Sequence, residues 1–119
     1  MGILRKRKSH EKYLKLIAKG HLSKGCNLCK DKNTIKKWKH WKIIYALFPY
    51  DKIATTHHLL LPIRHTTENK LSNAEKSELL YIKHHLGKKY EYILEAVDSI
   101  KSIPGHFHLH LLKIKDIIR

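Results

Sequence analysis

Apolar and polar residues alternate strictly near the end of the chain, in His106-Phe107-His108-Leu109-His110-Leu111-Leu112. Successive side chains of an extended strand point to opposite faces of a sheet. The pattern therefore predicts a strand over residues 106–112, with three imidazoles on one face and Phe107, Leu109 and Leu111 on the other. We expect the apolar face to pack on a core and the histidine face to carry chemistry.

Two earlier apolar stretches also predict strands. Residues 38–48 are rich in aromatic and β-branched side chains and end at Pro49. Residues 57–61 form a shorter apolar run that Pro62 closes. Proline lacks the amide proton that a sheet needs, so it commonly ends a strand. We expect residues 50–56 to connect the two strands.

Helical spacing of apolar residues predicts two helices. The first is short and basic, with Ser9 as its cap and Gly20 at its end. The second starts at the capping box Ser72-Asn73-Ala74-Glu75, and steps of three and four residues extend it from Asn73 to about Asp98. Its apolar stripe consists of Leu79, Ile82, Leu86, Tyr90, Ile93 and Val97.

Together these elements predict an α+β fold. We expect an antiparallel sheet of about four to five strands with the long helix packed on one face. The chain has 119 residues, enough for one domain with a modest core. We divide it into a basic N-terminal helix or extension, residues 1–22, and a main domain, residues 23–119.

The charge of the chain favours polyanionic partners. Lys and Arg number 25 against 10 acidic residues, a net charge of +15, and the basic residues are densest in residues 5–8 and 30–42. Nucleotide phosphates, nucleic acid and anionic membranes would all be attracted, although a general bias towards lysine explains many of these residues equally well. There is neither an apolar run long enough for a membrane span nor a signal peptide, so we expect a cytoplasmic protein.

The cysteines and histidines are the candidate chemical groups. Cys26 and Cys29 have the spacing of a metal knuckle or a redox pair rather than of a disulfide framework. Imidazole ligates metals, attacks phosphorus and relays protons near neutral pH. The simpler alternative for the histidine run is an edge strand whose polar face happens to be histidine.

Three segments of the chain resemble the histidine triad (HIT) superfamily. They are Cys26 with Cys29, then residues 57–65 of the form His-x-φ-φ-φ-Pro-x-x-His, and the His-φ-His-φ-His-φ-φ run at residues 106–112, where φ is apolar. The match is to the compact, zinc-binding Cys-x-x-Cys type. Phe48-Pro49-Tyr50-Asp51 also resembles a stretch of the galactose-1-phosphate uridylyltransferase branch.

The resemblance implies a metal site. In zinc-bearing members the ligands match Cys26, Cys29, His65 and His106. Two thiolates and two imidazoles form a closed tetrahedral shell, which suits a structural Zn²⁺ and leaves no position for a catalytic water. Such an ion would contribute to folding.

The resemblance also implies an activity, that of a HIT-type nucleotide hydrolase or nucleotidyl transferase acting at an α-phosphate through a covalent nucleotidyl-histidine intermediate. His108 matches the nucleophile, with His110 and His57 in support. The adjoining link offers Lys101, Ser102 and Gly105 for phosphate binding. Nucleoside phosphoramidates, dinucleoside polyphosphates and adenylylated intermediates are the expected substrates, and His58 should point to the opposite face of its strand.

Two other functions and one assembly remain open. The first function is an aprataxin-like activity on nucleic-acid-linked adenylate, with the basic N-terminal segment on the phosphate backbone. The second is a non-catalytic, zinc-stapled module that binds nucleotide or RNA, in which Trp38, Trp41 and Tyr45 stack on bases. A homodimer is the expected assembly, because HIT hydrolases commonly pair through helix and strand surfaces.

Overall fold

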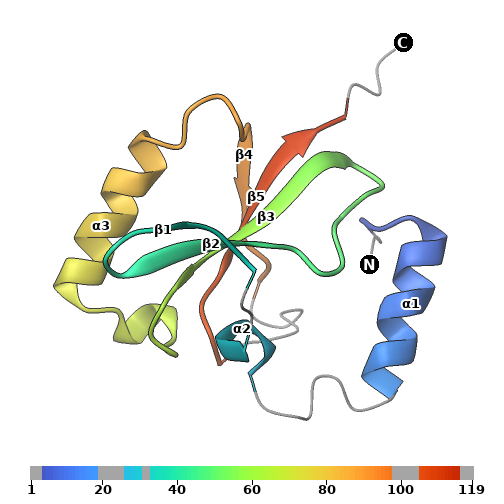
Figure 1. Ribbon diagram of the computed structural model, residues 1–119, viewed down its shortest axis with the longest axis horizontal. Coiled ribbons are helices and arrows are strands. Elements are labelled where there is room, and N and C mark those ends of the chain that lie inside the picture. Colours follow the sequence, from blue (N-terminus) through green and yellow to red (C-terminus); the bar gives the residue numbers. More distant parts are fainter. Residues whose placement is uncertain (1–3, 19–25, 31–32, 98–104, 116–119) are drawn as a thin grey trace.

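The sheet has five antiparallel strands in the order β1-β2-β3-β5-β4 (Figure 1). The computed structural model describes residues 4–18, 26–30, 33–97 and 105–115. The predicted α+β class and antiparallel sheet are confirmed. In chain order, the elements are α1 (Arg7–Ala18), α2 (Asn27–Lys30), β1 (Thr34–Lys37), β2 (Trp41–Tyr45), β3 (Ala54–Pro62), the 3-10 turn η2 (Glu68–Lys70), α3 (Asn73–His84), β4 (Tyr92–Leu94) and β5 (Leu109–Ile114).

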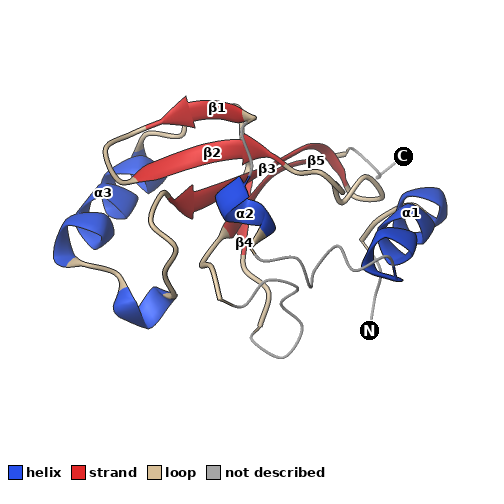
Figure 2. Ribbon diagram, turned by 60° about the horizontal axis from the view of Figure 1, so that its bottom comes forward, coloured by secondary structure: helices blue, strands red, loops and turns tan. Residues whose placement is uncertain are grey.

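The main core lies between one face of the sheet and α3 (Figure 2). Trp41, Leu60 and Leu111 come from three different strands, and Ile82 comes from the helix. All four are completely buried. The predicted packing of the helix on one face of the sheet is therefore confirmed.

A smaller core lies on the opposite face of the sheet. Leu28 of the short helix α2 packs there against Ile44 of β2 and Leu61 of β3, with Cys26 at its margin. His57 shares this face with Leu61, because residues four apart on a strand point the same way. The small core thus anchors α2 and its cysteines beside the histidine face.

The predicted long helix is wrong beyond its first three turns. Helix α3 ends at His84, and Gly87 follows with a φ of +74°, in the left-handed region that glycine adopts without steric cost. The chain then turns back, and Ile93 pairs with Leu111 on the edge of the sheet. Hydrogen bonds to a distant strand outweigh the local helical periodicity here. Leu86 and Tyr90 still pack against the main core, although neither lies on the helix.

Several predicted boundaries also shift. Strand β5 begins at Leu109, so His106 and His108 lie in the segment before it. Strand β2 covers only Trp41–Tyr45 of the predicted stretch 38–48, and β3 starts at Ala54, within the predicted connection. Strand β1 was not predicted, because its sequence TIKK is too short and too polar to stand out.

The capping box at the start of α3 is confirmed. The Ser72 hydroxyl accepts a hydrogen bond from the Glu75 amide, and the Glu75 carboxylate accepts one from the Ser72 amide. Arg64 also donates to that carboxylate at 2.7 Å and lowers its pKa to about 2. The cap therefore ties the helix to the segment that follows β3.

Helix α1 lies at the opposite end of the molecule from α3 in both views (Figures 1 and 2). It begins at Arg7, so Ser9 lies inside the helix and is not its cap, contrary to our prediction. The division at residue 22 stays a prediction. Within the residues described, no helix is long and apolar enough to cross a membrane.

Candidate active site and metal centre

Pairing of β3 with β5 brings two histidines into contact. His57 lies opposite Leu112, and His110 lies opposite Leu59, so the two histidines are diagonal neighbours on one face of the sheet. Nε2 of His57 is 2.8 Å from Nδ1 of His110, and both side chains are buried. The fold thus brings together two of the histidines that the sequence singled out.

The surrounding hydrogen bonds determine the tautomer of each ring. The Tyr50 backbone amide donates to Nδ1 of His57 at 2.9 Å, so the proton of a neutral His57 ring is on Nε2. That Nε2–H group donates to Nδ1 of His110. The remaining proton of a neutral His110 ring is therefore on Nε2. The hydrogen bonds therefore run in one direction, from the Tyr50 amide to His57 and from His57 to His110. The last group of this chain is the Nε2–H donor of His110.

Both rings are neutral at neutral pH. Burial lowers the pKa of His57 to about 3, with further contributions from the positive charges of Arg5, His58 and His108. Burial also lowers the pKa of His110 to about 3, assisted by His57, His108 and Arg5. A group with a pKa this low binds no proton in the physiological range. The tautomers assigned above are therefore the working states.

His108 lies beside this pair and is only half-buried. Its ring centroid is 5.3 Å from that of His110. Nδ1 of His108 is 2.9 Å from the backbone oxygen of His106. A carbonyl oxygen can only accept, so Nδ1 carries the proton and the lone pair of the neutral ring is on Nε2. A neutral imidazole in this state is a nucleophile.

Cys26, Cys29, His65 and His106 form a second cluster. One ligand atom from each lies within 4.8 Å of the others. Nδ1 of His106 is 3.4 Å from Sγ of Cys26 and 3.3 Å from Sγ of Cys29, while Nδ1 of His65 is 3.1 Å from Sγ of Cys29. Nε2 of His106 donates to the Pro62 oxygen at 2.8 Å, which leaves the Nδ1 lone pair directed at the thiols. These four side chains could therefore hold a metal ion.

The same arrangement of sheet and helix occurs in solved structures. A HIT family hydrolase from Legionella pneumophila Philadelphia 1 superposes with a TM-score of 0.57 at 20% identity, over 79% of this chain and 96% of that chain. The chain has the HIT fold. A histidine triad protein from Clostridium difficile (TM-score 0.57, 16% identity) and a HIT family hydrolase from Clostridium thermocellum (TM-score 0.57, 18% identity) share the HIT fold over 81% of this chain, and over 95% and 96% of their own chains. No protein-family model matches the sequence, and no curated protein matches it significantly.

The residues predicted for phosphate binding lie at the edge of what the structure describes. Lys101 and Ser102 are outside the described residues. Gly105 is described, and a Cβ built on it would lie 3.8 Å from Nε2 of His65. Gly105 is therefore next to the cluster formed by Cys26, Cys29, His65 and His106.

His58 points away from the histidine cluster, as expected. Its Nδ1 is 2.5 Å from the Tyr90 hydroxyl, and its ring contacts the edge of Tyr45. These partners are on the α3 side of the sheet, where Tyr90 packs on the main core. The alternation of faces along β3 thus separates two adjacent histidines.

Of the aromatic residues considered for base stacking, Trp41 is ruled out. It is completely buried, and its Nε1–H donates to the Glu75 backbone oxygen at 2.8 Å. Trp38 is half-buried against the main core, whereas Tyr45 is 59% exposed. A base-stacking surface made of all three residues is therefore wrong.

Sequence reasoning missed Tyr50 as part of the site. Its ring lies 4.4 Å from that of His57 and is stacked on His110 at 5.0 Å. The signal was present in the Phe48-Pro49-Tyr50-Asp51 resemblance, from which we assigned Tyr50 no role in the site. Arg5 was also missed, because its contact with Phe48 spans 43 positions and leaves no local pattern.

Proposed function

We propose that the protein is a nucleotide hydrolase or nucleotidyl transferase that acts at an α-phosphate, with His108 as nucleophile. The observation that carries the proposal is the hydrogen bond from Nδ1 of His108 to the His106 oxygen, which leaves the Nε2 lone pair for attack. Two of the similar solved structures are described as HIT family hydrolases, which supports an enzyme of this class.

In this mechanism the reaction has two displacements at phosphorus. Nε2 of His108 attacks the α-phosphorus, so an N–P bond forms and the bond from phosphorus to the leaving group breaks. Water, or another acceptor, then attacks the phosphorus, the N–P bond breaks, and its electron pair returns to Nε2. Imidazole suits both steps, because it is a good nucleophile when neutral and a good leaving group once phosphorylated.

His110 and His57 support this chemistry without attacking the substrate. The Nε2–H of His110 is the free end of the hydrogen-bond chain, and we assign it to a phosphate oxygen or the leaving group. His57 holds His110 in the tautomer that can donate. Gly105, Lys101 and Ser102 remain the candidates for further phosphate contacts.

We assign Zn²⁺ to the cluster of Cys26, Cys29, His65 and His106. Bonds of about 2.3 Å to sulfur and about 2.0 Å to nitrogen at tetrahedral angles place a sulfur and a nitrogen ligand about 3.5 Å apart. The distances of 3.1 to 3.4 Å in the cluster fit that value. Zn²⁺ would tie α2 to the segments that carry His65 and His106. Thiolate ligands also agree with a reducing compartment such as the cytoplasm.

The covalent intermediate provides the direct test. We expect a short incubation with an adenosine phosphoramidate to add one nucleotidyl group to the intact protein, and fragmentation at neutral pH to locate it on His108. Free AMP should appear on longer incubation. If the protein binds the nucleotide but neither forms the adduct nor releases AMP, the proposed enzyme is wrong and the non-catalytic binding module replaces it.

A groove beside α1 favours nucleic-acid-linked adenylate as a second candidate substrate. Its volume is about 510 Å³, with Lys12 and Lys15 on the helix side and Leu47, Phe48 and Pro49 on the other. Cations next to an apolar wall suit a phosphate backbone with its bases. Tyr50 follows directly after Pro49, so the groove adjoins the histidine site.

Salt dependence tests this second candidate. We expect affinity for a single-stranded oligonucleotide to fall as salt rises, with a log–log slope of about −0.7 for each neutralised phosphate. Removing both groove lysines, Lys12→Ala with Lys15→Ala, should reduce the magnitude of the slope by roughly one to two. The control removes two exposed lysines elsewhere, Lys37→Ala with Lys76→Ala. Equal slopes in the two double variants would exclude the groove as the binding site.

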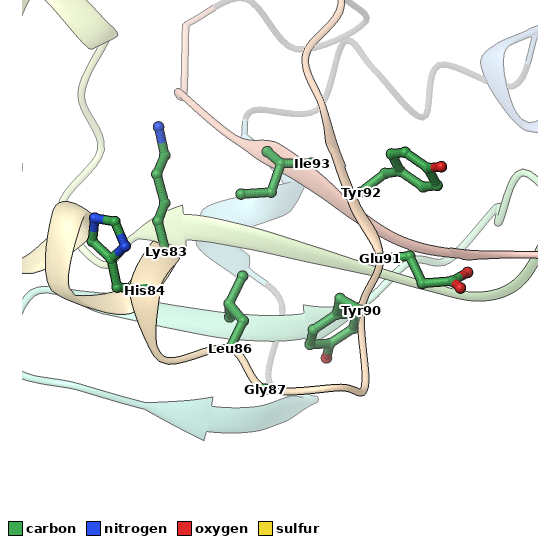
Figure 3. Close-up of a pocket in the computed structure, with 8 residues that line it drawn as sticks. All are labelled: Lys83, His84, Leu86, Gly87, Tyr90, Glu91, Tyr92 and Ile93. Atoms are coloured by element: carbon green, nitrogen blue, oxygen red, sulfur yellow. The ribbon is translucent and has the colours of Figure 1, made fainter.

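We also propose a homodimer that pairs through the α3 and β4 surfaces. Strand β4 is the last strand of the sheet, and its Tyr92 and Ile93 are 62% and 40% exposed. Figure 3 shows these side chains on opposite sides of the strand. Ile93 and Leu86 both line a pocket of about 320 Å³. Leu80 of α3 is 60% exposed. An exposed apolar strand at a sheet edge is a ready site for pairing with a second copy.

Substitution of Ile93 tests the dimer. Ile93→Lys places a charge in the proposed interface, and we expect the dissociation constant of the dimer to rise at least about 30-fold, the effect of a central interface residue. Sedimentation velocity over a concentration series measures it. Leu47→Lys is the matched control. Leu47 is 67% exposed and lies in the connection between β2 and β3, outside the proposed interface. A parent protein that is monomeric at every concentration would overturn the dimer.

A further inference from the structure

The segment before α1 is attached to the loop between β2 and β3. The amide of Lys6 donates to Oδ1 of Asp51 at 2.6 Å, and the Ser9 hydroxyl donates to Oδ2 of the same carboxylate. The amide of Lys52 donates to the Leu4 oxygen at 3.0 Å. Both oxygens of the Asp51 carboxylate thus accept hydrogen bonds from the N-terminal residues. These bonds hold the loop between β2 and β3 next to Arg5.

The guanidinium group of Arg5 lies over two aromatic rings. Its Cζ lies 4.3 Å from the ring centroid of Tyr13 and 5.0 Å from that of Tyr50. Its Nε–H donates to the Phe48 oxygen at 2.8 Å, which fixes the plane of the guanidinium. Cation–π contacts with partly desolvated rings stabilise such an arrangement.

The Tyr50 ring in turn covers the histidine pair. It makes an angle of 35° with the ring of His57 and 27° with that of His110, at 4.4 and 5.0 Å between centroids. The amide of the same residue is the donor that sets the His57 tautomer. Contacts therefore run without a break from Arg5 through Tyr50 to both buried histidines.

We propose that Arg5 is a positioning residue of this site, which holds Tyr50 against His57 and His110 and thereby fixes the orientation of both rings. The effect on catalysis rests on the proposed function at His108, whereas the effect on the two rings does not. Arg5 lies within residues 1–22, which we assigned from the sequence to an N-terminal helix or extension, and the proposal makes it part of the site.

The charge of Arg5 also acts on the two histidines, because it favours their neutral forms. The positive charge of Arg5 lowers the pKa of both His57 and His110, in addition to burial. Among the described residues, the other titratable groups that act on the pair or contact it are Tyr50 on the loop, His58 on β3 and His108 before β5. Burial raises the pKa of Tyr50, so its phenol is neutral at physiological pH.

Histidine titration by NMR tests the proposal without any activity. In Arg5→Ala we expect the His57 and His110 resonances to shift and their pKa values to rise by about one unit, because a nearby cation and a covering ring are lost. Arg7→Ala is the matched control. It removes the same charge two residues away, from a side chain that is 94% exposed and pairs with Glu11. Equal titrations in both variants would overturn the proposal.

Kinetics tests the consequence for catalysis. We expect Arg5→Ala to lower kcat about 10-fold to 100-fold with little change in KM, the effect of a small misplacement of catalytic groups. Arg5→Lys keeps the charge but loses the planar stacking, so it should restore the histidine pKa values and only part of kcat. In a Tyr50→Ala background, Arg5→Ala should have little further effect. Additive losses in that background would contradict action through Tyr50.

Controls distinguish a failure of the proposed function from a failure of the proposed role of Arg5. Circular dichroism and thermal unfolding establish that each variant is folded, and Arg5→Lys supplies the comparison if Arg5→Ala is not. If the parent has no turnover but Arg5→Ala still changes the titration of His57 and His110, the proposed function is wrong and the role of Arg5 stands. If the parent turns over and Arg5→Ala behaves as Arg7→Ala does, the role of Arg5 is wrong.

Discussion

Replacement of His108 by alanine is expected to abolish turnover of a fluorogenic adenosine phosphoramidate, with a loss of at least about 10³-fold in kcat. His110 cannot replace the proposed nucleophile in forming the N–P bond, because its Nδ1 accepts from His57 and its Nε2 carries a proton. Parent and variant should be assayed side by side at moderate salt.

The control for this prediction is His84→Ala. His84 is exposed at the end of α3, so its loss removes an imidazole without touching the cluster. His110→Ala should show an intermediate loss, since it removes a donor but leaves the nucleophile. Retention of more than a tenth of the parent kcat by a folded His108→Ala protein would contradict the assignment of the nucleophile.

The second large effect concerns the metal centre. Cys26→Ser is expected to remove one zinc per chain and to lower the free energy of unfolding by several kcal/mol, because the binding energy of a structural zinc is part of the folding energy. The ligands come from α2 and the residue before it, from the segment after β3 and from the segment before β5, so loss of the ion would free three parts of the chain at once. Elemental analysis and urea unfolding measure the two quantities.

A chelator provides the internal control for the metal prediction. The parent treated with chelator should unfold at the urea concentration found for Cys26→Ser, and the variant should not respond to chelator. The result that contradicts a structural zinc is a parent that keeps its stability after complete removal of the metal.

Local sequence was sufficient wherever a short pattern encodes the structure. The capping box predicted the start of α3 at Asn73, because it depends on residues only three positions apart. Alternation predicted a strand over residues 106–112, but β5 begins at Leu109, so the common face of the three histidines stays a prediction. The metal-ligand set from Cys26 to His106 came from a resemblance in motif spacing, and the fold brings these four residues together.

Local sequence patterns did not predict the elements that depend on contacts between distant parts of the chain, such as β4. The apolar spacing around Tyr92 and Ile93 fits a helix as well as a strand, and only hydrogen bonds to β5 decide between them. The left-handed backbone at Gly87, which follows the end of α3, lets the chain turn back towards β5.

By itself, therefore, the sequence determined the α+β fold class and the start of α3, because hydrophobic period and helix capping are local properties. The resemblance in motif spacing supplied the candidate metal ligands. Only the tertiary structure decided which imidazoles touch, which tautomers they hold and that Arg5 reaches them through Tyr50. Those features depend on the register between β3 and β5 and on a contact across 43 positions. The free energy of such contacts is realised only when the whole chain has folded.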